Sequence, residues 1–209
     1  MLDFRKKMNL TEEDNIIILG DAGICWHYTK KDMYYYIKEW ENYESVPMLY
    51  FLDGNHENFD ILNSLSIENN EGIVSDHIHW LKRGTIKYFE NKKCLFIGGA
   101  ESIDNFNRVE HLSWWPEESI TDQDISLIDI GQYDYVFSHT CPISILNEYK
   151  FSLCDLSLDQ SKINHNSENK LEALKNYIDF NQWWFGHFHK NIKLNDQFRC
   201  LYKQWEVLK

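Results

Sequence analysis

The stretch Met48-Leu49-Tyr50-Phe51-Leu52-Asp53-Gly54-Asn55-His56-Glu57 decides the fold of this chain. Its five apolar residues predict a buried β-strand, and the polar residues after them predict a tight turn where that strand ends. Three further stretches repeat the pattern, each with a short apolar run before an Asp or a His. They are 16–19 before Gly20-Asp21, 135–137 before Ser138-His139, and 183–185 before Gly186-His187-Phe188-His189.

Polar side chains therefore follow four predicted strands at the point where each strand ends. In open α/β sheets this edge is where ligands bind. Carboxylate, amide and imidazole donors gathered at one edge suit a divalent transition metal. The sequence thus predicts a metal site built from strand ends.

Length and charge limit the possible functions. The chain has 209 residues, which predicts one domain over 1–209 with a sizeable core. Its net charge of −12 argues against general nucleic-acid binding, which needs clustered Lys and Arg. A phosphate substrate stays compatible with this charge, because a bound metal inverts the local field.

Cysteine usage and hydropathy indicate a compartment. The five cysteines are widely scattered, and none forms a Cys-x-x-Cys pair, which is typical of reduced thiols. We find neither a signal peptide nor an apolar run as long as a membrane span. We therefore expect a cytoplasmic protein without a membrane partner, and the oligomeric state stays open.

The remaining periodicity predicts a mixed α/β domain. Helices are expected over 31–43, 57–65, 121–130 and 167–177. Short strands over 78–81, 85–89 and 94–97 read as an antiparallel meander, and 199–207 reads as a final strand.

In their order along the chain, the four motifs resemble those of the calcineurin-like metallophosphoesterase family. Gly98-Gly99-Ala100 and Trp114-Trp115-Pro116-Glu117-Glu118 look like a bacterial branch of that family. The resemblance spans Asp21 to His189. It implies an α/β (α+β) fold, in which a two-sheet β-sandwich is flanked by helices.

The resemblance also implies a set of metal ligands. One metal site would take Asp21, Asn55, His139 and His187. The second would share Asp21, whose carboxylate has an oxygen for each of two ions, and would add His189. Such mixed ligands fit manganese, iron, nickel or zinc.

One family motif, a strand that ends in Asp-x-His, does not occur before the strand that carries Asp21. Only residues 1–14 precede that strand. We therefore expect a chain that is shortened at its N-terminus and lacks the first strand. We also expect one well-formed metal site and one incomplete site, for which Glu57 and Asp53 are the alternative ligands.

By resemblance, His56 faces the substrate as the general acid for the leaving oxygen. Arg108 is a candidate clamp for the phosphate. These residues predict a metal-dependent phosphoesterase that hydrolyses a phosphorylated small molecule or another phosphoester by metal-activated water.

Two alternatives stay open at this point. The chain is alternatively a truncated, catalytically weak or inactive remnant that acts as a binding module. A Ser/Thr protein phosphatase is disfavoured, because those enzymes carry an Asp where this chain has Ile24.

Overall fold

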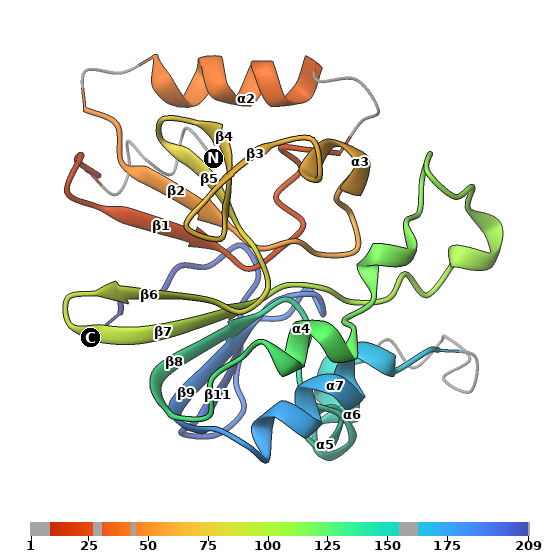
Figure 1. The fold of residues 1–209 in the computed structure, drawn as a ribbon. Coiled ribbons are helices and arrows are strands. Elements are labelled where there is room, and N and C mark those ends of the chain that lie inside the picture. The colour runs from red at the N-terminus through yellow and green to blue at the C-terminus, as the bar shows by residue number, and fades with distance from the viewer. Residues whose placement is uncertain (1–8, 27–30, 43–44, 155–162, 209) are drawn as a thin grey trace.

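The computed structural model describes residues 9–26, 31–42, 45–154 and 163–208 (Figure 1). These residues form a mixed α/β fold with two mixed β-sheets and surrounding helices, which confirms the predicted α/β class. Among them, no helix is both long enough and apolar enough to cross a membrane.

The first sheet holds five strands in the order β1-β2-β5-β4-β3. Strands β1, β2 and β5 are parallel, whereas β4 and β3 are antiparallel to their neighbours. Strand β1 is the edge strand on one side of the described sheet. The strands are β1 (Asn15–Ile18), β2 (Met48–Phe51), β3 (Ser66–Glu68), β4 (Glu71–Ser75) and β5 (Ile78–Leu81).

The second sheet holds six strands in the order β10-β11-β9-β8-β7-β6. Strands β7, β8, β9 and β11 are parallel, and the outer strands β6 and β10 are antiparallel to them. The strands are β6 (Thr85–Phe89), β7 (Lys92–Ile97), β8 (Gln132–Ser138), β9 (Asp179–Phe185), β10 (Ile192–Lys193) and β11 (Phe198–Cys200).

Helices cover the outer faces of both sheets. Figure 1 shows α2 over the first sheet and α4 to α7 against the second. The α-helices are α2 (Lys31–Glu41), α3 (Phe59–Leu62), α4 (Asp122–Ser126), α5 (Ile143–Glu148), α6 (Lys150–Leu153) and α7 (Asn166–Lys175). Two 3-10 helices are η1 (Asn105–Asn107) and η2 (Pro116–Glu118).

Alternating side chains of the strands divide the interior into three apolar clusters. Leu49 of β2 packs toward α2 and α3, whereas the adjacent Tyr50 packs between the two sheets. In β8, Val136 faces α5 and α7, and Phe137 faces the first sheet. This two-residue period places the sheets face to face and fixes which strand ends meet.

Four of the predicted elements differ from the structure. The helix expected over 121–130 is only α4, which ends at Ser126. Strands β5 and β6 lie in different sheets, so the predicted single meander over 78–97 is wrong. The helix expected over 57–65 is only α3, because the Asn58 side chain caps it by accepting from the Ile61 N–H. The final strand expected over 199–207 is limited to β11.

Arg83 occupies the crossover from the first sheet to the second. Its guanidinium donates two hydrogen bonds to Asp53, from Nε at 3.0 Å and from Nη2 at 2.8 Å. Asp53 is fully buried at the end of β2. Further hydrogen bonds of Arg83 reach the carbonyl oxygens of Glu117, Glu118 and Ser119 and the carboxylate of Asp124.

We expect Arg83→Met to destabilise the fold by about 3–5 kcal/mol, because Asp53 then holds a buried charge without its ion-pair partner. Urea unfolding measures this loss in the free energy of unfolding. The double variant Arg83→Met with Asp53→Asn should recover part of it, because no charge is left buried. A single variant as stable as the parent would contradict the assignment.

Candidate metal centre

Two pairs of parallel strands, one pair in each sheet, bring the predicted ligands to one place. Asp21 follows β1 and Asn55 follows β2 in the first sheet. His139 and His187 follow β8 and β9 in the second sheet. Because the sheets lie face to face, these four strand ends meet between them.

The donor atoms of the four residues lie close together. His139 Nε2 is 3.4 Å from Asp21 Oδ2 and 3.2 Å from Asn55 Oδ1. Asn55 Oδ1 is also 3.1 Å from His187 Nδ1. The structure therefore assembles Asp21, Asn55, His139 and His187, which the sequence analysis placed in one site.

The tautomer of His139 follows from its other nitrogen. Nδ1 lies 2.6 Å from the carbonyl oxygen of Leu19, which only accepts, so Nδ1 carries the hydrogen. In the neutral ring, Nε2 then points a lone pair at two oxygens. A backbone partner of this kind on the second nitrogen is typical of metal-bound histidines.

This arrangement attracts a positive charge. Burial alone would lower the pKa of His139, but the Asp21 carboxylate and the Leu19 carbonyl raise it to about 9. Burial opposes ionisation of Asp21 as well, yet His139 and two further histidines hold its pKa well below the usual range. Burial and the neighbouring His139 lower the pKa of His187 to about 4. Either a proton or a metal ion would satisfy the facing donors.

The donor spacing fits a divalent metal. Bonds of about 2.0–2.2 Å at tetrahedral or octahedral angles place neighbouring donors about 2.9–3.6 Å apart. The observed separations of 3.1, 3.2 and 3.4 Å fall in that range. Within the described ranges, no three His, Cys, Asp or Glu side chains are arranged to hold an ion by themselves. The set becomes a candidate site only when the amide oxygen of Asn55 is counted.

Three of the predicted ligands have an uncommon backbone conformation. Asp21, His187 and His189 have φ angles of 53°, 62° and 53°, in the left-handed region that non-glycine residues usually avoid. Such conformations cluster at functional sites, where the surrounding structure enforces them. The spacing of two residues between His187 and His189 predicts both rings on one face of an extended strand. That prediction is wrong, because neither histidine has extended backbone.

Two glycines make the close approach possible. A Cβ on Gly54 would overlap Asp21 Oδ1 and His139 Nε2, and a Cβ on Gly20 would overlap the His139 ring. Any side chain at either position would push the donor atoms apart.

The remaining predicted site residues lie around this centre. His189 is exposed and stacks on Tyr202, with the ring centroids 4.5 Å apart. It belongs to the cavity wall rather than to the group of four. The His56 ring lies 4.9 Å from that of Trp26, and burial lowers its pKa. Arg108 forms an ion pair with Asp104, with its Nε 2.8 Å from the Asp104 carboxylate.

The alternative ligands Glu57 and Asp53 are both occupied elsewhere. The Glu57 carboxylate accepts from the backbone N–H groups of Ala22 and Gly54. Burial, followed by the charge of Asp21, raises the pKa of Glu57 to about 8. Asp53 accepts from Trp80 at 3.1 Å and from Arg83.

Ser102 and Glu118 support Asn55, and sequence reasoning missed both. The Ser102 hydroxyl donates to the Asn55 carbonyl at 3.3 Å and lies 3.4 Å from Asn55 Nδ2, so Oδ1 faces the histidines. Glu118 is buried and accepts from the Ser102 N–H at 3.0 Å. An isolated Ser and Glu carry no sequence signal for such roles.

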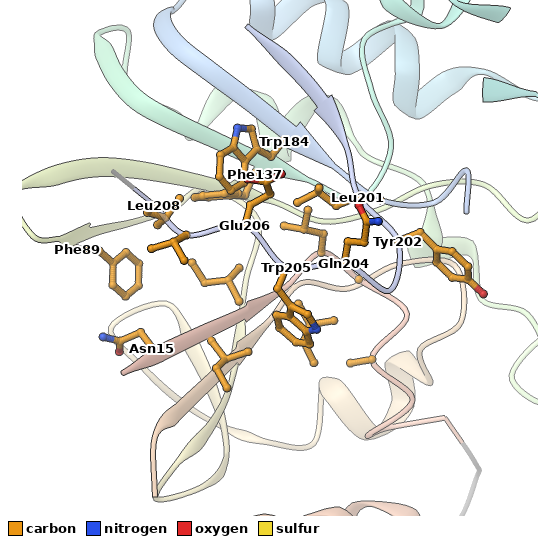
Figure 2. Close-up of a pocket in the computed structure, with 18 of the residues that line it drawn as sticks. Asn15, Phe89, Phe137, Trp184, Leu201, Tyr202, Gln204, Trp205, Glu206 and Leu208 are labelled. Atoms are coloured by element: carbon orange, nitrogen blue, oxygen red, sulfur yellow. The ribbon is translucent and has the colours of Figure 1, made fainter. Parts of the chain in front are cut away.

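A cavity of about 870 Å³ opens beside the four residues. Asp21, His139 and His187 contribute to its wall, together with β1 and residues 201–208. Figure 2 shows Phe137 and Trp184 on one side of this cavity and Asn15 on the other. Asp21, His139 and His187 are therefore accessible to a small molecule.

Comparison with known proteins gives no match, either to models of protein families or among curated proteins.

The stability of the metal-free protein should depend on pH through the carboxyl group of Glu118. Burial raises its pKa to about 7 from 4.5, so the folded state binds a proton that the unfolded state releases over that interval. Stability should therefore fall as pH rises from about 5 to 8. We would measure melting temperatures at four pH values in the presence of a chelator. They should fall less steeply with rising pH for Glu118→Gln than for the parent protein. Identical slopes for the two proteins would refute the assignment.

Proposed function

We propose that this chain is a metal-dependent phosphoesterase of the calcineurin-like type. The observation that carries the proposal is the meeting of Asp21, Asn55, His139 and His187 at four strand ends, with donor separations of 3.1–3.4 Å. The order of the four motifs along the chain supports the same assignment.

These four residues would hold a manganese, iron, nickel or zinc ion. When bound, such an ion supplies positive charge for the phosphoryl oxygens and lowers the pKa of a water molecule. The chain itself contributes a fixed, largely buried cradle, because His139 is held by Leu19 and Asn55 is held by Ser102. Preorganised donors of this kind need little rearrangement during the reaction.

His56 is assigned the proton transfer to the leaving oxygen. Its ring lies against Trp26, and its backbone N–H donates to Asp21 Oδ1 at 3.0 Å, so the main chain anchors it to the centre. A bound phosphate would raise the pKa of the ring by its negative charge. Arg108 interacts electrostatically with His56, which supports a position near the substrate.

The cavity beside the centre supports a phosphorylated small molecule as the substrate. All five cysteines are free thiols, which fits the reducing cytoplasm. The position of His189 favours one well-formed metal site and one incomplete site. His189 stacks on Tyr202 outside the group of four. Of the ligands assigned to the second site, only Asp21 therefore belongs to that group.

The proposal predicts metal binding and hydrolysis by the same four residues. The purified chain with added Mn²⁺ should bind about one ion and hydrolyse p-nitrophenyl phosphate or its diester. Asp21→Asn should reduce both, because the amide removes the anionic charge from the centre. Binding without turnover would favour the binding-module alternative, and a chain that neither binds Mn²⁺ nor hydrolyses either ester would refute the proposal.

His56→Ala separates catalysis from metal binding. Its turnover of the aryl ester should fall about 10²–10⁴-fold, because a general acid contributes roughly that much. Metal content, measured by elemental analysis, should stay at the parental value. A loss of metal together with activity would make His56 a ligand instead.

A further inference from the structure

Glu57 is a fully buried carboxylate that the proposed reaction does not use. Oε1 accepts from the Ala22 N–H at 2.8 Å, and Oε2 accepts from the Gly54 N–H at 2.6 Å. A carboxylate is suited to this position, because both of its oxygens accept and neither needs to donate. The hydrogen bonds therefore join two separate turns through one side chain.

The two joined turns are those that carry ligands. Ala22 directly follows Asp21, and Gly54 directly precedes Asn55. Two further hydrogen bonds link the same turns, from the His56 N–H to Asp21 Oδ1 at 3.0 Å and from the Asn58 N–H to the Cys25 carbonyl at 2.6 Å. Of these links, Glu57 is the one that a substitution of its own side chain can remove without touching a ligand.

Pairing of β1 with β2 does not by itself fix the positions of these ligands. The paired register of the two strands ends at Ile18 and Phe51, before either turn begins. Asp21 also has a left-handed backbone, with φ 53°, which an unrestrained aspartate rarely adopts. A bond to the next residue's N–H opposes relaxation of this conformation.

We propose that Glu57 is a positioning residue, which sets the separation of Asp21 and Asn55 and thereby the affinity of the centre for a divalent transition metal. This inference rests on the proposed function. It adds that the affinity depends on a carboxylate that touches two backbone N–H groups and no metal.

Co²⁺ titration of the full chain tests the inference, because the visible absorption of Co²⁺ reports its coordination geometry as well as its binding. Glu57→Gln keeps the size of the side chain but replaces one acceptor by an N–H₂ group, so one turn is released. Its dissociation constant for Co²⁺ should rise about 10–100-fold, as for other residues that orient metal ligands. Its absorption spectrum at saturation should also differ from that of the parent.

Glu101→Gln is the matched control. Glu101 is also buried, and its two oxygens accept from the backbone N–H and hydroxyl of Ser167 at the start of α7. The control should melt at a lower temperature but bind Co²⁺ with the parental affinity and spectrum. Equal weakening in both variants would overturn the inference, because a general loss of packing would then explain it.

Glu57→Asp provides a second variant if the glutamine variant does not fold. The shorter side chain keeps its charge and both acceptors but cannot span the two turns, so it should also bind Co²⁺ more weakly. Parental affinity in either folded variant overturns the inference and leaves the proposed function intact. A parent that binds no Co²⁺ overturns both.

Discussion

The ion pair between Arg83 and Asp53 is the constraint on which the arrangement of this molecule depends. Arg83 lies between the last parallel strand of the first sheet, β5, and the first strand of the second sheet, β6. Its guanidinium donates hydrogen bonds both to the turn after β2 and to the segment from η2 to α4. Since α4 belongs to the helices that cover the second sheet, this one side chain ties both sheets together beside the four residues proposed as ligands.

The local electrostatics of the centre follow from that geometry. Bringing the ends of β1 and β2 against those of β8 and β9 makes the side-chain oxygens of Asp21 and Asn55 face Nε2 of His139. Atoms that all carry lone pairs repel each other in a buried site unless a cation lies between them. This cation can be either a proton or a divalent metal ion. Metal binding therefore displaces protons from such residues.

The sequence predicted the parts of the structure that have local signals. Each apolar run before a polar turn is a strand, and the polar residues at the four turns lie together as expected. Local patterns failed where tertiary contacts decide the conformation. The turn 82–84 reads as a hairpin, yet Arg83 sends the chain to the other sheet through partners far away in sequence. Gly186-His187-Phe188-His189 reads as extended, but two of its residues are left-handed, which no propensity indicates.

Glu57 shows why a sequence motif does not reveal which residues hold its turn in place. In sequence, Glu57 looks like the first residue of a helix or an additional ligand. In the structure, its carboxylate turns back to two backbone N–H groups, and α3 begins only at Phe59. Burial raises the pKa of this carboxyl group, and the cost of burying it is partly offset by short hydrogen bonds to both turns and by the charge of His139. A buried acid tolerated at that cost, directly beside the strained backbone of Asp21, is more consistent with a role in holding the turns than with a role in general stability.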